Sequence, residues 1–130
     1  MNATRILLVD DEKEFVQTLA ERLELRGLEP EVAYDGKAAL DAVSRNPPHL
    51  VVLDLYMPGI SGDVVLHSIK TRHPRLPVIL LTGHGAVRDD AAESAGLAYA
   101  CLAKPLALDE LLCVLRQAAQ EAGMEWGGNA

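Results

Sequence analysis

The stretch Leu50-Val-Val-Leu-Asp54 decides the fold, because it is a run of apolar residues that ends in an acid. Two other runs share this design: Arg5 to Val9 precedes Asp10, and Val78 to Leu81 precedes Thr82. Short apolar runs without alternation are typical of strands that are buried on both faces of a parallel sheet. The sequence therefore predicts three central strands, each followed by a polar side chain at its carboxyl end.

Two weaker strands and a set of helices complete the pattern. We expect strands over Glu31 to Tyr34 and over Tyr99 to Ala103, because turn residues follow both. A short, mobile helix is expected over residues 88–94, which offer mostly alanine for burial. Gly27 and Asn46-Pro47-Pro48 suit the ends of the first two helices. Helical spacing of apolar residues is found at Val16, Leu19, Ala20 and Leu23, at Ala38, Ala39, Ala42 and Val43, at Val65 and Ile69, and at Leu108, Leu111, Leu112, Leu115 and Ala119.

Strands that alternate with helices over 130 residues indicate one α/β domain with right-handed crossovers. Such a domain is an α/β sandwich. In the sheet of such a domain the chemistry gathers at the carboxyl ends of the strands.

Composition excludes several classes of protein. A net charge of -7, with twelve scattered Lys and Arg residues, argues against direct nucleic-acid binding. No apolar stretch is long enough to span a membrane, and Met1 to Arg5 does not begin a secretory signal, so we expect a cytoplasmic protein. Cys101 and Cys113 lack ligand spacing and are expected to be reduced, buried packing residues.

Five side chains are predicted to converge at one edge of the sheet. Asp10 and Asp11 follow the first strand, Asp54 the third, Thr82 the fourth and Lys104 the fifth. Three carboxylates gathered without a partner would repel one another, so a cation is expected among them. Mg²⁺ is the expected cation, because it prefers oxygen ligands and bridges to phosphate.

Four separated motifs resemble the receiver domains of two-component response regulators. They are Asp10-Asp11, Asp54-Leu-Tyr-Met-Pro-Gly-Ile-Ser-Gly62, Leu81-Thr-Gly-His-Gly85 and Lys104-Pro105, in this order and each at a strand end. The resemblance implies a flavodoxin-like (CheY-like) three-layer sandwich around a doubly wound, five-stranded parallel sheet of strand order 2-1-3-4-5. It also implies a phosphoacceptor that signals through a protein surface.

By this resemblance, Asp54 takes a phosphoryl group from a phosphohistidine, and the domain catalyses only its own phosphorylation and dephosphorylation. The resemblance implies that Asp11 ligates Mg²⁺ directly and that Asp10 does so mostly through water. Asp54 and the main-chain carbonyl of Tyr56 complete the protein ligands. The metal offsets the charge of the transferring group.

The resemblance also assigns the remaining polar residues. Lys104 pairs with the phosphoryl oxygens, the Thr82 hydroxyl binds another oxygen, and the Lys104-Pro105 peptide bond is cis. Receiver domains usually have an aromatic switch residue where this chain has Cys101. Tyr99 is two residues earlier on the same side of the strand and is the alternative switch residue.

The resemblance implies a sensor histidine kinase or phosphotransfer protein as one partner and an unknown downstream protein or output domain as the other. The output face would comprise the fourth helix, the fifth strand and the fifth helix, and a homodimer through that face is compatible with the sequence. We assign residues 1–122 to the receiver domain and 123–130 to a C-terminal tail or linker. By the resemblance, Tyr56 and His84 occupy positions that flank the phosphorylated Asp54, where their bulk hinders an attacking water, so we expect a fairly long-lived phosphoryl group.

Other interpretations stay open at this point. Asp10 or Asp11 alone would more often cap a helix, and His49, His67 and His73 are expected at the surface. A phosphohydrolase of the haloacid-dehalogenase type would use Asp10 as nucleophile, but its second aspartate is replaced by a glutamate. A phosphate-independent binding module would typically lose the acidic pair, the acceptor or the lysine.

Overall fold

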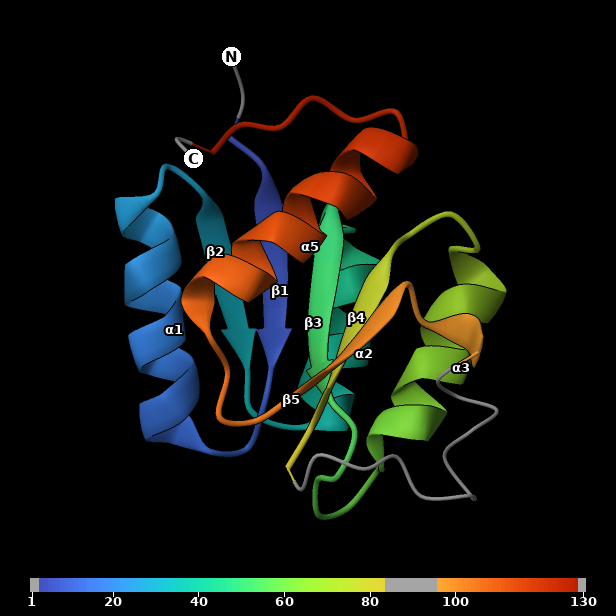
Figure 1. The fold of residues 1–130 in the computed structure, drawn as a ribbon. Coiled ribbons are helices and arrows are strands. Elements are labelled where there is room, and N and C mark those ends of the chain that lie inside the picture. Colours follow the sequence, from blue (N-terminus) through green and yellow to red (C-terminus); the bar gives the residue numbers. More distant parts are fainter. Residues whose placement is uncertain (1–2, 84–95, 129–130) are drawn as a thin grey trace.

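The computed structural model describes residues 3–83 and 96–128, which form three layers (Figure 1). The central sheet is parallel, with strand order β2-β1-β3-β4-β5. This order confirms the predicted doubly wound sandwich. The strands are β1 (Arg5–Val9), β2 (Glu29–Ala33), β3 (Leu50–Asp54), β4 (Val78–Thr82) and β5 (Ala100–Ala103), and the helices are α1 (Lys13–Leu25), α2 (Gly36–Arg45), α3 (Gly62–Arg72) and α5 (Leu108–Glu121).

The sheet divides the core into two parts. Helices α1 and α5 cover one face, and α2 and α3 cover the other (Figure 1). Successive residues of β1 point to opposite faces, so Ile6 and Leu8 pack toward α1 and α5 while Leu7 and Val9 pack toward α2 and α3. Every residue of β3 and β4 is buried. The uninterrupted apolar runs of the sequence follow from this burial on both faces.

The second strand differs from its predicted range, because it begins at Glu29 instead of Glu31 and ends at Ala33 instead of Tyr34. The Glu29 N–H donates to the Thr4 carbonyl (2.9 Å), which starts the ladder early. Pro30 is tolerated inside the strand because β2 lies at the edge of the sheet. The fifth strand is one residue shorter than predicted and begins at Ala100.

The helix ends follow the sequence signals. Gly27 adopts a positive φ of 82°, and the Leu28 N–H returns to the Leu23 carbonyl (3.2 Å). That geometry ends α1 and favours glycine. Asn46 ends α2 as predicted. The helix predicted over 88–94 lies outside the described residues.

The segment after α5 packs against the amino end of the sheet (Figure 1). Met124 and Trp126 contact the core cluster on the α1 and α5 face. The Gly127 N–H donates to Thr4 Oγ1 (2.8 Å), and this hydroxyl donates to the Glu125 carbonyl (3.4 Å). Residues 124–127 therefore have contacts of their own with the domain.

Two expectations about single side chains were wrong. Cys113 is exposed on α5 and Cys101 is only partly buried. His49 is half-buried, because its Nδ1 accepts the Arg5 N–H (2.8 Å) at the start of β1. His67 is exposed as expected, and His73 is partly buried.

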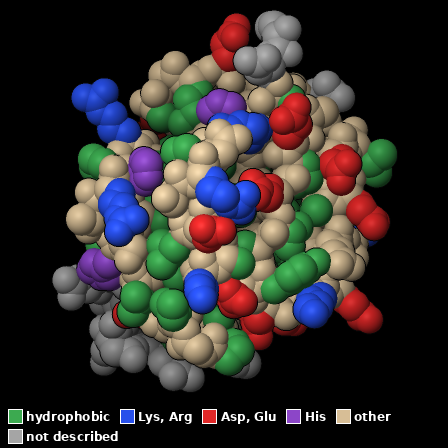
Figure 2. Space-filling model, turned by 180° about the vertical axis from the view of Figure 1, so that it is seen from behind, with side chains coloured by type: hydrophobic (Ala, Val, Ile, Leu, Met, Phe, Trp, Pro, Cys, Tyr) green, Lys and Arg blue, Asp and Glu red, His purple; other side chains and the backbone are tan. Residues whose placement is uncertain are grey.

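Side chains of like charge do not form a separate cluster at the centre of the face that α2 and α3 cover. Figure 2 shows basic side chains interspersed with acidic ones there. On α2, the exposed residues Arg45 and Asp41 form such a pair (3.1 Å). None of the helices within 3–83 and 96–128 is long and apolar enough to cross a membrane.

Candidate functional site

Three strands bring a buried polar side chain to the same edge of the sheet. Asp10 follows β1, Asp54 ends β3 and Thr82 ends β4, with exposures of 1%, 4% and 2%. They are neighbours because β3 pairs with both β1 and β4. Two buried carboxylates are costly unless a positive charge and hydrogen bonds compensate them.

Lys104 supplies one positive charge at this edge. The backbone N–H of Lys104 donates to the Thr82 carbonyl (2.8 Å), which continues the pairing of β5 with β4. Its Nζ lies 2.8 Å from Asp10 Oδ2, 2.7 Å from Glu12 Oε1 and 3.5 Å from Asp54 Oδ2. The side chain is 12% exposed, so these contacts are shielded from solvent on the lysine side.

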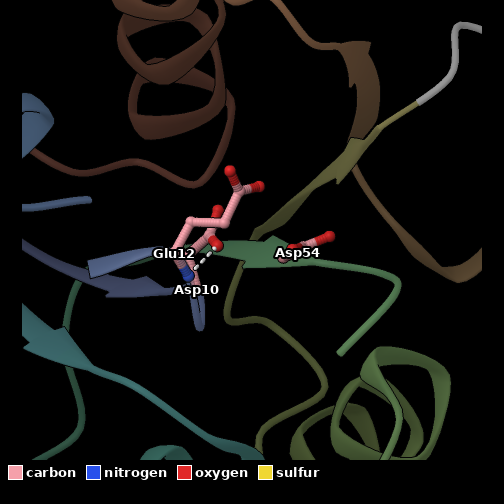
Figure 3. Close-up of side chains that lie close together, drawn as sticks. All are labelled: Asp10, Glu12 and Asp54. Carbon is pink, nitrogen blue, oxygen red and sulfur yellow. Dashed lines mark hydrogen bonds between the residues drawn. The ribbon is translucent and has the colours of Figure 1, made fainter. Parts of the chain in front are cut away.

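Backbone N–H groups hold the other oxygen of each buried carboxylate. The Glu12 N–H donates to Asp10 Oδ1 (2.9 Å), and the Tyr56 N–H donates to Asp54 Oδ1 (3.1 Å). The first of these bonds is drawn in Figure 3, where the Glu12 carboxylate extends beyond that of Asp10. Each aspartate thus presents one oxygen to the backbone and the other to Lys104.

The pKa of Asp54 is raised from 3.8 to about 6. Burial is the largest cause and the Asp10 carboxylate is the second, while Lys104 and the Tyr56 N–H act in the opposite direction. Burial alone would lower the pKa of Lys104, but its bonds to Asp10 and Glu12 outweigh burial and raise this pKa. The site therefore keeps its lysine charged, while ionisation of Asp54 is unfavourable.

An open cavity of about 910 Å³ gives access to this site. The Phe15 ring forms part of its wall, and its centroid lies 4.5 Å from Lys104 Nζ. A cation over an aromatic face is favourable. The Lys104-Pro105 peptide bond, which is cis, lies at the rim. The described lining residues are Glu12, Phe15, Asp54, Tyr56, Gly83, Lys104, Pro105 and Leu106.

The carboxylates fit a hard divalent cation. Asp10, Glu12 and Asp54 each offer an oxygen, and these oxygens lie within 4.8 Å of one another. Burial and then the Asp10 carboxylate raise the pKa of Asp54, and a bound cation would favour its ionised form. Oxygen donors of this kind suit Mg²⁺. Asp11, predicted as the direct ligand, is exposed and lies outside this group.

The loop after β3 holds Asp54 in place through two glycines. Gly59 has a positive φ of 77°, which favours glycine at this turn. Gly62 has a different role, because a Cβ there would lie 2.4 Å from the Asp54 carbonyl oxygen and 2.6 Å from Leu55 Cα. The start of α3 therefore packs directly against the backbone of the central aspartate.

The two predicted switch residues have different surroundings. Cys101 packs against the core on the α2 and α3 face. Tyr99 is 37% exposed, and a hydrogen bond to Glu121 of α5 raises its pKa. Thr82, the last residue of β4, is buried. His84 lies outside the described residues.

Comparison with known proteins identifies the fold and the family. Residues 6–116 match the family model described as response regulator receiver domain. The chain belongs to the response regulator receiver family. Receiver domains are signalling switches, and neither the hydrolase nor the phosphate-independent module is favoured for this one.

Relatives of this receiver domain include longer proteins. It is 38% identical to the response regulator MprA of Mycobacterium sp. (strain KMS) over 112 residues, 86% of this chain and 49% of that protein. The chain thus spans about half the length of the curated relatives that it matches first. The solved structure of a response regulator receiver domain protein from Clostridium thermocellum has 30% identity and a TM-score of 0.85, with 92% and 97% of the two chains covered. The NtrX receiver domain from Brucella abortus has 36% identity, a TM-score of 0.81 and coverage of 88% and 98%.

Sequence reasoning missed two residues of the site. Glu12 contacts Lys104, although the sequence drew attention only to the two aspartates before it. Phe15 was not singled out, although its ring lies over the same ammonium. Three consecutive acids after β1 were the available signal for Glu12. Which of them turn inward depends on the backbone between β1 and α1.

Proposed function

We propose that Asp54 is the phosphoacceptor of this receiver domain. A carboxylate oxygen attacks the phosphorus of a phosphohistidine on a sensor histidine kinase or phosphotransfer protein. The P–O bond forms as the P–N bond breaks, and the electron pair of that bond returns to the imidazole. The observation that supports this best is a nearly buried Asp54 that borders an open cavity, with Lys104 Nζ 3.5 Å away.

Other residues of the chain orient and balance the reacting groups. Asp10 and Asp54, with Asp11 or Glu12 and the Tyr56 carbonyl, would hold Mg²⁺. When bound, the ion offsets the negative charge of the phosphoryl group. Lys104 would pair with a phosphoryl oxygen. The domain then promotes its own phosphorylation and dephosphorylation and acts on no other substrate.

The Thr82 hydroxyl would bind a further phosphoryl oxygen and so convert the modification into a change of shape. Thr82 is 2% exposed and its carbonyl accepts the Lys104 N–H, so a shift of this residue reaches β5 directly. Cys101 is the better placed switch residue, because it packs in the core on the α2 and α3 face, whereas Tyr99 bonds to α5. The surface around β5 and α5 would carry the signal to a downstream protein or output domain.

A phosphorylation assay tests the proposal. The protein is incubated with acetyl phosphate and Mg²⁺, and its intact mass is measured at short intervals. We expect one added phosphoryl group, no addition to Asp54→Asn, and none when a chelator removes the metal. Addition to Asp54→Asn at the wild-type rate would contradict the assignment, and loss of addition only in Asp10→Asn would favour the hydrolase.

A further inference from the structure

Glu12 makes a contact that its position in the chain does not require. It is the N-cap residue of α1, yet its side chain makes no capping hydrogen bond. Its Oε1 instead lies 2.7 Å from Lys104 Nζ, 92 residues along the chain. The side chain remains 62% exposed. Ordering a long, exposed side chain costs conformational entropy, so the contact with Lys104 must offset that cost.

The contact is a hydrogen bond that Lys104 Nζ donates to Glu12 Oε1. An ammonium group has three N–H donors, and three carboxylates surround this one. Asp10 and Glu12 lie at hydrogen-bonding distance and Asp54 lies 3.5 Å away. A phosphoryl oxygen that binds Lys104 therefore competes with these carboxylates for the ammonium group.

Burial decides which carboxylate leaves. The side chains of Asp10 and Asp54 are 2% and 5% exposed, so separating either from Lys104 would leave a buried charge without its partner. Glu12 can turn into water at little cost, because more than half of its side chain is already there. Glu12 is the exchangeable partner of the lysine.

We propose that Glu12 is a positioning residue that holds Lys104 in the unphosphorylated domain and releases it to the phosphoryl group. This inference rests on the proposed function of Asp54. Glu12 thereby competes with the incoming phosphate in two ways. It occupies a donor of Lys104 that the phosphate can bind, and its own negative charge repels the phosphate. Both effects slow phosphorylation and weaken the binding of a phosphoryl mimic.

A metal-ligating Glu12 would have the opposite effect. Its oxygen lies within 4.8 Å of oxygens from Asp10 and Asp54, so the two roles have to be separated by experiment. If Glu12 served the metal, removing its charge would weaken Mg²⁺ binding and slow phosphorylation. If it restrains Lys104, the same change accelerates phosphorylation once Mg²⁺ is saturating.

The test compares Glu12→Gln with Glu14→Gln. Glu14 is exposed in the first turn of α1, borders a different groove and is not among the described partners of Lys104, so it controls for the loss of one charge. Phosphorylation by acetyl phosphate at saturating Mg²⁺ is followed by intact mass. Beryllium fluoride affinity is measured through the backbone amide signals of the site. A mostly exposed ion pair is worth up to about 1 kcal/mol, so we expect Glu12→Gln to react about fivefold faster and to bind beryllium fluoride about fivefold more tightly than wild type.

Glu14→Gln should stay within about twofold of wild type in both measurements. A Glu12→Gln protein that matches Glu14→Gln, or that reacts more slowly than wild type, would overturn the inference. Failure of the proposed function is distinguishable from these outcomes, because then no adduct would form on the wild type or on either variant. Amide spectra of the variants without ligand confirm that both remain folded.

Discussion

Replacing Asp54 by asparagine should stabilise the metal-free protein at neutral pH. Burial and the adjacent Asp10 raise the pKa of Asp54 from 3.8 in the unfolded chain to about 6 in the folded one. An ionised Asp54 is therefore unfavourable in the fold. Each pKa unit is worth about 1.4 kcal/mol, so a difference of about two units corresponds to about 3 kcal/mol. Asparagine has nearly the same shape and cannot ionise, so it removes this penalty.

The sign of the effect depends on pH. Between about pH 4 and pH 6 the folded wild type binds a proton that the unfolded chain has released, so its stability falls as pH rises through this window. Above about pH 6 Asp54 is ionised in the folded and the unfolded protein, so the full cost of its ionisation lowers the stability. Below about pH 4 Asp54 is protonated in both states and this cost disappears. The gain from Asp54→Asn should be close to zero near pH 4 and reach about 3 kcal/mol near pH 8.

Urea unfolding followed by circular dichroism, with chelator present, measures this difference. Asp41→Asn is the control, because Asp41 is 68% exposed in a surface pair with Arg45 and should change stability by less than about 1 kcal/mol. Saturating Mg²⁺ should narrow the gap between wild type and Asp54→Asn. The reasoning fails if Asp54→Asn is no more stable than wild type near pH 8, or if its gain is the same near pH 4.

Three further predictions concern the surroundings of the site and the end of the chain. Lys104→Met leaves two buried carboxylates without their cation, so urea unfolding near pH 8 should show that the free energy of unfolding falls by about 3 kcal/mol. The loss should be smaller near pH 4, where the carboxylates bind protons. An equal loss at both pH values would contradict the view that Lys104 stabilises the fold by its charge. Gly62→Ala places a Cβ against the backbone of β3 and should lower the free energy of unfolding by roughly 3 kcal/mol. Gly83→Ala, whose Cβ would have no atom within 4 Å, should lower it by less than about 1 kcal/mol. Equal losses would show that the loop before α3 moves to accommodate the Cβ at position 62. Gly127→Ala puts a Cβ 2.8 Å from the Thr4 nitrogen, so the fluorescence of the single tryptophan should shift to the red as the segment detaches, and an unchanged spectrum would contradict its docking.

Most of the fold could be predicted, because buried strands and helices require recognisable patterns of apolar residues in the sequence. The uninterrupted apolar runs at Leu50 and Val78 mark strands that are buried on both faces. The start of β2 was missed, because a proline ordinarily argues against a strand and Pro30 is tolerated only since β2 lies at the edge of the sheet. The exposure of Cys113 could have been predicted, because it lies off the stripe that Leu111, Leu112 and Leu115 form on α5.

The site could be predicted in outline from the ends of the strands. Asp10, Asp54, Thr82 and Lys104 meet because parallel strands end at the same edge. The choice of inward-facing acid after Asp10 could not be predicted, because it depends on the turn into α1 and on Lys104, which comes from the far end of the sequence. The same holds for His49, which precedes β3 and whose hydrogen-bond partner, the Arg5 N–H, lies at the start of β1 in another part of the chain.

The account depends most on the identity of the phosphoacceptor, and borohydride reduction of the phosphorylated protein tests this most directly. Borohydride converts an aspartyl phosphate into homoserine at the residue that carried it, and mass spectrometry of the digested protein then locates the change. The account predicts homoserine at position 54, in a yield that follows the phosphorylated fraction, and none without Mg²⁺. Homoserine at position 10 or 11, or a phosphoryl group on a histidine with position 54 unchanged, would contradict it.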